Sequence, residues 1–460
     1  MTAIGLIFCA QAARADETTT LRLDVKPPYS EGLAGSLDLG FSSYIFSNRP
    51  YFGSEEKSST MPIVGATLAG RDRHTFVDGN WFYSTPEDKH YFDVRELSEN
   101  FHREGYNLWF GRHLEEWSQS DSFWRLGYWQ PRFNWDKLRP DENGFTGVFV
   151  EPEINNNLLL SVFVTPIFLP EFGPDFRESN GTVESANPWF RNPPPVIELW
   201  QRNTQMRVSV NTPNTTDTIF KPSLALKATM RSDDETWARV SYAFKPMNTP
   251  LMAYNYSVVS LSSATYMDVV VQPQFIYHHI ASFESQMKSG EVAIVPSLTY
   301  DAPQVPSAPA ERISQDMAAS LIGSISFVWH PEGVKSESLY GGVMYNWTQF
   351  PPDRGENAQN LSQFELRPTW LSAYRLGYEH FAAKLHGRGW GYGVEGTVDP
   401  RQNGGEFLSQ VRYAWDKQWQ SRLRADFIGV LSDASNPYET GFIQTYRANS
   451  TLGLDVSYVY

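Results

Sequence analysis

The sequence predicts an all-β fold, a transmembrane antiparallel β-barrel. Apolar and polar residues alternate from about residue 36 to the final residue, which indicates strands because successive side chains of a strand point to opposite faces. Many apolar rows end in Tyr or Trp. The richest apolar run, residues 158–169, is interrupted by Ser161, Thr165 and Pro166, whereas a membrane helix needs roughly 18 apolar residues in a row. Strands, not helices, are therefore expected to cross the bilayer.

Composition narrows the class of protein further. The 460 residues carry a net charge of −14, which argues against a nucleic-acid partner because such binding relies on cations that displace counterions. Aromatic residues make up 15% of the chain, which excludes intrinsic disorder. The single cysteine, Cys9, excludes a scaffold stapled by disulfides.

The amino terminus has the features of an export signal. Residues 3–10 form a short apolar core, and residues 13–15 supply the small-x-small pattern that precedes cleavage. We therefore predict a signal peptide over residues 1–15 and a short periplasmic segment over residues 16–35. Phe8 is too bulky for the position before a lipid-modified cysteine, so a lipoprotein is not favoured.

Alternating segments recur along the remaining chain, with apolar residues on one face and Ser, Thr, Gly or charged residues on the other. The clearest are residues 36–41, 205–211, 223–230, 238–244, 339–347, 390–395, 407–415, 422–431 and 452–460. A soluble sandwich would show the same alternation, but two details favour lipid. Apolar rows that end in Trp347, Trp390, Trp415 and Tyr460 suit aromatic girdles at the headgroup level. The opposite faces are polar enough to line a lumen.

The length of the alternating region sets the number of strands. About 10 residues per strand and roughly 15 per connection give about 17 strands between residues 36 and 460. Bacterial single-chain barrels have even numbers of strands, so we expect about 16, and 14 or 18 also fit. Two long connections lie near residues 169–200 and 301–316 and are rich in proline, which cannot donate to a strand ladder. They are either outer loops or segments folded into the pore.

The end of the chain carries the most specific motif. Residues 451–460 read TLGLDVSYVY. Gly453 stands two positions after the polar Thr451, and alternating hydrophobic residues then lead to the aromatic Tyr460. This pattern resembles the β-signal of outer-membrane proteins, with Gly453, Val456, Tyr458 and Tyr460 at the matching positions. The resemblance implies recognition by the barrel assembly machinery.

The region over residues 36–460 as a whole resembles a porin-type outer-membrane β-barrel. The resemblance implies short periplasmic turns, longer outer loops and a polar interior. It also implies residence in the outer membrane of a Gram-negative bacterium, in contact with lipid and lipopolysaccharide, and assembly as a homo-oligomer. Some porin-like families instead form bowl-shaped rings that enclose lipid.

Clusters of residues that would predict catalysis, a metal site or a cofactor site are not found. His278 and His279 are adjacent, so on a strand they point to opposite faces and cannot share a metal ion. None of the nine histidines is followed by serine two residues later, the arrangement of outer-membrane lipid hydrolases. Glu115 and Glu116 diverge for the same reason. We predict a protein that is not an enzyme and needs no cofactor.

Basic residues are concentrated in the carboxy-terminal strands. The 94 residues from Arg367 hold 10 Lys and Arg against 9 Asp and Glu, although the whole chain carries −14. If the apolar rows face lipid, the opposite rows line the lumen. The predicted lumen residues are Arg375, Lys384, Arg412, Arg422, Arg424, Asp426 and Arg447. Such side chains either shape a field that selects ions and polar solutes, or pair with carboxylates and brace the barrel.

A dense aromatic stretch runs from Trp109 to Trp135. Girdle and strand packing explain it best. Contacts with sugars, lipid chains or a neighbouring subunit are the functional alternatives.

Together, these observations predict a passive porin-like channel for ions and small polar solutes, with selectivity from lumen charge and loop constriction. Two alternatives stay open. One is a structural outer-membrane homo-oligomer that organises or encloses lipid around a blocked lumen. The other is a secreted carbohydrate-binding β-protein that is soluble without detergent.

Overall fold

The computed structural model describes residues 32–45, 48, 59–71, 74–155, 157–193, 195–199, 201–232, 236–260, 265–304, 313–314, 317–331, 337–348, 369–381, 389–431 and 441–460. The predicted signal peptide with Cys9, most of the 16–35 segment, Lys384 and most of the 301–316 connection lie outside these residues.

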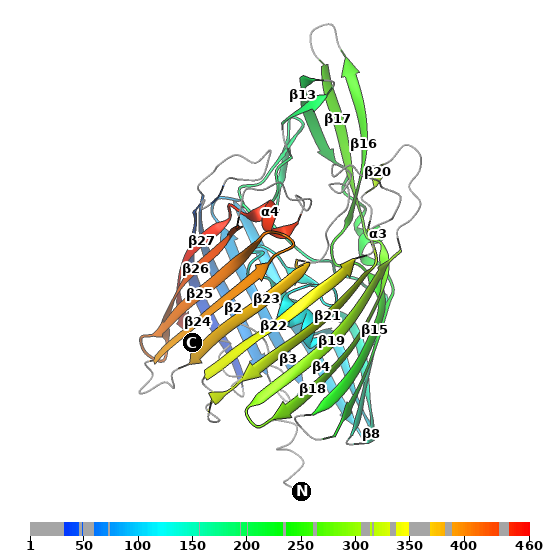
Figure 1. Cartoon of the computed structure of the whole chain (residues 1–460), viewed down its shortest axis with the longest axis vertical. Helices are drawn as coiled ribbons and strands as arrows, with labels where there is room; N and C mark the ends of the chain where they lie inside the picture. Colours follow the sequence, from blue (N-terminus) through cyan, green and yellow to red (C-terminus); the bar gives the residue numbers. More distant parts are fainter. Residues whose placement is uncertain are drawn as a thin grey trace.

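Eighteen antiparallel strands form one closed barrel (Figure 1). In chain order they are β1 (Gly32–Ile45), β2 (Thr60–Arg71), β3 (Thr75–Ser84), β4 (Lys89–Arg103), β5 (Tyr106–His113), β8 (Phe145–Asn155), β9 (Leu158–Thr165), β14 (Ser223–Arg231), β15 (Trp237–Pro246), β18 (Tyr277–Ser289), β19 (Val292–Pro303), β21 (Ser320–Trp329), β22 (Glu337–Thr348), β23 (Ser372–Phe381), β24 (Gly389–Asp399), β25 (Gly404–Ala414), β26 (Trp419–Val430) and β27 (Ser450–Val459). The last strand closes the barrel by pairing with β1, from Ser36 opposite Val459 to Ile45 opposite Ser450.

The number of strands corrects the expected 16. Connections alternate between the two ends of the barrel, and at one end they are only two to seven residues long, as at 104–105 and 330–336. At the other end they reach 57 residues, over 166–222. An average of roughly 15 residues per connection therefore overestimates half of the connections, and the chain has enough residues for another hairpin.

The outer surface of the barrel is apolar and the inner surface is polar. On β26 and β27, Leu423 and Leu454 are 53% and 48% exposed, whereas Asp426 and Asp455 on the opposite faces are 1% and 7% exposed. Exposed aromatics such as Trp347, Trp390, Trp415 and Tyr460 lie near the strand ends. A barrel in a lipid bilayer requires an apolar outer surface and exposed aromatic residues near the strand ends. The predicted all-β transmembrane barrel is therefore confirmed.

A second sheet stands beyond the long-connection end of the barrel (Figure 1). Its strands are β12 (Val196–Leu199), β13 (Arg202–Val210), β17 (Thr265–Gln274), β16 (Leu251–Ser260) and β20 (Ile313–Ser314), in this spatial order. β13 and β17 run parallel. The alternating residues 205–211 therefore belong to this outer sheet and not to the barrel. Alternation indicates a strand with one apolar and one polar face, but it does not indicate which sheet the strand joins.

Short elements complete the fold. They are the hairpin of β10 (Arg177–Ser179) and β11 (Thr182–Glu184), and the helices α3 (Thr215–Ile219) and α4 (Phe442–Tyr446). Within the described part of the chain, none of the helices has the length and apolar character needed to cross a bilayer.

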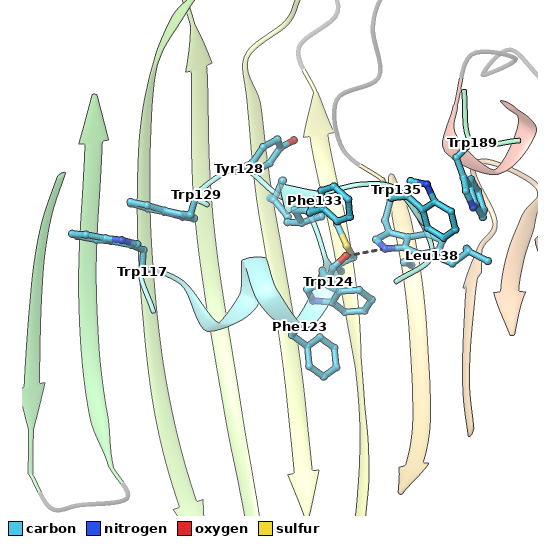
Figure 2. Packing of buried hydrophobic residues seen from close by; sticks show 14 of the residues in the cluster. Trp117, Phe123, Trp124, Tyr128, Trp129, Phe133, Trp135, Leu138 and Trp189 are labelled. Carbon is cyan, nitrogen blue, oxygen red and sulfur yellow. Dashed lines mark hydrogen bonds between the residues drawn. The ribbon is translucent and has the colours of Figure 1, made fainter. Parts of the chain in front are cut away.

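The connection between β5 and β8, residues 114–144, enters the barrel and is called the insert below. It contains α2 (Gln119–Trp124) and the short strands β6 (Arg132–Phe133) and β7 (Asp141–Glu142). Figure 2 shows α2 lying across the inner face of several barrel strands, with aromatic side chains on either side. The aromatic residues of this segment stand out in the sequence, but the segment is not identified there as a long connection, because it is not proline-rich.

Candidate functional site

The insert is anchored to the barrel wall at the start of α2. Glu284 on β18 accepts hydrogen bonds from the Ser118 hydroxyl (2.6 Å) and from the backbone N–H groups of Gln119 and Ser120 (2.9 and 3.0 Å). Ser118 also accepts from the N–H of Asp121 and so begins the helix. The buried carboxylate thus satisfies helix donors that would otherwise lack partners inside the barrel.

A buried group of charges fixes the end of α2. Arg125, which ends the helix, pairs with Glu395 on β24 and with Glu406 on β25, the latter at 3.1 Å. Arg375 on β23 lies 3.6 Å from Glu395 and donates to the carbonyl of Phe123. Two arginines therefore share two carboxylates, and each connects the insert with the wall.

The second half of the insert has its own tie. Arg139 donates through Nε and Nη2 to the two carboxylate oxygens of Asp426 on β26, at 2.8 and 2.6 Å. This bidentate geometry orients the guanidinium plane as well as holding it. The insert is consequently attached to β18, β23, β24, β25 and β26.

Burial also changes the acidity of a carboxyl group in the insert. Asp121 is surrounded by protein, and this loss of solvent raises its pKa to about 7, with a smaller rise from the nearby Glu142. The N–H groups of Tyr128 and Trp129 donate to its two oxygens (3.1 and 3.2 Å) and oppose the rise. Asp121 therefore titrates near neutral pH.

Aromatic side chains of the insert form a core inside the barrel (Figure 2). Trp117, Trp124 and Trp129 are fully buried, and the rings of Trp117 and Trp129 stack with centroids 5.9 Å apart. The expectation that this stretch forms a girdle is wrong for the residues from Trp117 to Trp135. It fits Phe110 on β5, which is exposed on the outer face. The pattern misleads because a run of aromatic residues indicates an apolar environment. It does not distinguish lipid outside the barrel from a packed core inside it.

A cavity of about 300 Å³ remains between the insert and one part of the wall. The wall of this cavity comes from β1 to β4 and from β25 to β27, and the other side comes from insert residues between Ser122 and Glu142. Its charged lining residues are Asp38, Asp78, Arg95, Arg125, Arg132, Asp136, Arg139, Asp141, Glu142, Arg412, Arg422, Arg424 and Asp455. The cavity is therefore the polar space that the insert leaves open.

Three of the predicted lumen residues lie together in this cavity. Arg412 on β25 is the register partner of Arg422 on β26, so two guanidinium groups are neighbours on one face. Asp455 on β27 lies 3.1 Å from Arg422 and 3.3 Å from Arg424. Two of the arginines therefore share the carboxylate of Asp455, and Arg424 also lies 3.8 Å from Asp136. Arg412 adds a further positive charge to this part of the cavity.

The other predicted lumen residues have different positions. Arg375 and Asp426 point inward but are engaged with the insert, as described above. The prediction that Arg447 lies on a strand is wrong. Arg447 is the C-cap residue of α4, and its side chain donates to the Gln444 side chain. Sequence reasoning missed Arg125 and Arg139, because their carboxylate partners lie 270 to 287 residues away in the chain. It also did not single out Asp38, although the alternation places this residue on the polar face of its strand.

The histidine pair behaves as its spacing predicts. His278 points inward and contacts Asp301 at 2.5 Å, whereas His279 contacts the Tyr242 hydroxyl at 2.8 Å and the ring of Phe244. Among the residues that the structure describes, no group of three potential metal ligands occurs.

The closed barrel, its apolar outer face and its partly filled polar interior define a transmembrane β-barrel protein. No family model matches the chain, and no curated protein matches it. Among solved structures, it is similar to OccK11 (OpdR) of Pseudomonas aeruginosa, with 12% identity, 93% of this chain and 95% of that chain covered, and a TM-score of 0.43.

Two further solved structures are similar to the same extent. OccAB3 of Acinetobacter baumannii has 10% identity, covers 93% of this chain and 98% of its own, and gives a TM-score of 0.45. A BenF-like porin from Pseudomonas fluorescens Pf-5 has 10% identity, with 94% and 99% covered and a TM-score of 0.46. Similarity at this level says nothing about solute or activity.

Proposed function

We propose that the protein is a passive channel of the bacterial outer membrane for ions and small polar solutes. The observation that carries the proposal is the cavity between the insert and the wall, which is lined by charged side chains inside a barrel with an apolar exterior. Charged walls that enclose water select solutes by size and charge without catalysis or a cofactor. The insert supplies the constriction.

The charge of the cavity supports a preference for anions. Arg412, Arg422 and Arg424 lie on two neighbouring strands of the cavity wall. Asp455 pairs with Arg422 and Arg424, and Asp136 lies 3.8 Å from Arg424, so the three arginines outnumber the carboxylates beside them. Guanidinium groups match carboxylates and phosphates in charge and geometry. The field from these arginines concentrates small anions at the constriction.

A planar-bilayer measurement on the purified full chain tests the channel. We expect discrete single-channel steps and, in a salt gradient, a reversal potential on the anion-selective side. Pure protein that inserts, as shown by its heat-modifiable mobility in gels, but gives no conductance would reject the channel.

One observation favours the alternative of a structural barrel with a blocked lumen. The insert buries several tryptophans and five contacts with charged side chains inside the barrel, which is dense packing for a constriction loop. A homo-oligomer in detergent without conductance would support this function, and the native mass of the protein would establish its oligomeric state. Both functions use the same predicted assembly signal at Gly453, Val456, Tyr458 and Tyr460.

A further inference from the structure

Two opposite charges in the cavity lack opposite partners. Asp38 on β1 accepts hydrogen bonds from the hydroxyls of Ser36 (2.9 Å) and Thr67 (3.1 Å), and no cationic group of the described chain lies within ion-pair distance of it. Arg412 on β25 donates to the side-chain oxygen of Gln420 (2.7 Å), and none of the described carboxylates pairs with it. Both side chains line the same cavity and are half-buried.

The two charges lie on different parts of the cavity wall. The charged lining residues contributed by β25 and β26 are the three arginines Arg412, Arg422 and Arg424. Those contributed by β1, β3 and β4 are Asp38, Asp78 and Arg95, and Arg95 lies 3.7 Å from Asp78. Asp455 on β27 lies between the two parts and pairs with Arg422 and Arg424. The cavity therefore has a positive side at β25 and β26, and Asp38 on β1 is a negative charge without an ion pair among the described residues.

Strand register sets the separation of the two sides. Arg412, Arg422, Asp455 and Gly40 follow one another across β25, β26, β27 and β1, and Asp38 is two residues from Gly40 on the same face. Neighbouring strands are about 4.8 Å apart, so β25 and β1 are separated by about 14 Å along the wall. This separation is too large for Asp38 and Arg412 to neutralise each other, but one solute with two charged ends can contact both.

We infer that the cavity binds dipolar solutes in which a carboxylate and an ammonium group are separated by several bonds, such as an ω-amino acid or a short peptide. The carboxylate contacts Arg412 and Arg422, and the ammonium group contacts Asp38. This inference names a solute class for the proposed channel and therefore rests on that function. A simple anion would satisfy the arginines and leave Asp38 without a counter-charge.

Calorimetric titration of the full chain in detergent at low salt and pH 7.5 tests the inference. The probes are 4-aminobutyrate, butyrate and butylammonium, which share a chain length and differ in their charged ends. We expect 4-aminobutyrate to bind at least tenfold more tightly than either of the others. Equal affinity for 4-aminobutyrate and butyrate would overturn the inference.

Variants assign the two ends. Asp38→Asn should remove the advantage of 4-aminobutyrate over butyrate, and Arg412→Gln should weaken the binding of both. Lys288→Ala, on β18 at the opposite side of the barrel, is the matched control and should bind as the wild type does. Heat-modifiable mobility confirms that each variant is folded. An unchanged preference in folded Asp38→Asn would refute the assignment.

The outcome separates this inference from the proposed function. Binding of 4-aminobutyrate without bilayer conductance would support the solute class and reject the channel. Conductance without selective binding would support the channel and reject the solute class.

Discussion

At the scale of single residues, the arginines of the cavity have the clearest functional meaning. Like charges opposite one another on neighbouring strands destabilise a sheet, so the register pair Arg412 and Arg422 is unfavourable in an empty barrel. The proposed binding of a solute with a negative charge would relieve this repulsion. The strand alternation was sufficient to predict these two residues and Arg424, because it shows which face they occupy.

The first prediction concerns the charge of the constriction. The double substitution Arg422→Ala and Arg424→Ala leaves Asp455 without its two cationic partners. We expect the reversal potential in a salt gradient to move clearly toward cation selectivity, with channel formation retained. Lys288→Ala removes one positive charge from the opposite wall and should leave the reversal potential near the wild-type value. An unchanged potential in the double variant would show that these arginines do not set selectivity.

The second prediction uses the acidity of Asp121. Its pKa is about 7 in the folded protein and about 3.9 in an unfolded chain, so the folded state binds the proton more tightly. The contribution of this group to stability is complete below about pH 4 and is lost as the pH rises through about 7. We therefore expect a higher melting temperature in detergent at pH 5 than at pH 8, and a smaller difference in Asp121→Asn. An equal pH dependence in both proteins would contradict the assignment.

At the scale of elements, the insert is the feature that sequence patterns could not predict. Its ties join residues that are 166 to 287 positions apart, from Ser118–Glu284 to Arg139–Asp426. Alternation reports local geometry, so it shows that Asp426 faces inward and does not show what meets it there. The two proline-rich connections that the sequence indicates, near residues 169–200 and 301–316, do not include the insert that contains α2.

The third prediction tests the insert as the constriction. Arg139→Ala leaves the Asp426 carboxylate buried without its partner, which costs about 3–5 kcal/mol when a buried pair is broken. We expect this change to loosen residues 132–142 and to give a larger, noisier single-channel conductance. The double substitution Arg139→Ala and Asp426→Ala removes both charges and should be less destabilised. Wild-type conductance in a folded Arg139→Ala variant would argue that this half of the insert does not restrict the pore.

At the scale of the whole molecule, closure depends on the two terminal strands. β27 pairs with both β26 and β1, and the pairing extends to Tyr460, whose N–H donates to the Gly35 carbonyl at 3.0 Å. The same residues carry the predicted assembly signal. Closure and the predicted recognition thus involve one short segment of chain.

The fourth prediction follows from this overlap. Removal of residues 458–460 eliminates both the aromatic end of the signal and the last backbone bonds to β1. We expect a several-fold lower fraction of heat-modifiable protein in outer membranes, with little change when purified chains are refolded in detergent. Tyr256→Ala, in the outer sheet, is the control. Equal losses in cells and in detergent would assign these residues to closure alone and not to a signal.

The whole molecule also shows the limits of prediction from sequence. The class of fold follows from alternation, because a barrel with lipid outside and water inside imposes two faces on each strand. Alternation does not predict the number of strands in the barrel, nor that residues 205–211 belong to the outer sheet, because both depend on which strands pair with each other. The contents of the lumen depend on contacts between distant segments, which no local pattern records.

The position of the insert has a consequence for biogenesis. Its carboxylate and arginine partners on β18 and β23 to β26 enter the periplasm after the insert itself, since export proceeds from the amino terminus. If folding follows the order of export, the final hairpins wrap around a polypeptide that is already in place. Maturation would then be timed by the arrival of these late hairpins, and chains stalled midway would display tryptophans to periplasmic chaperones.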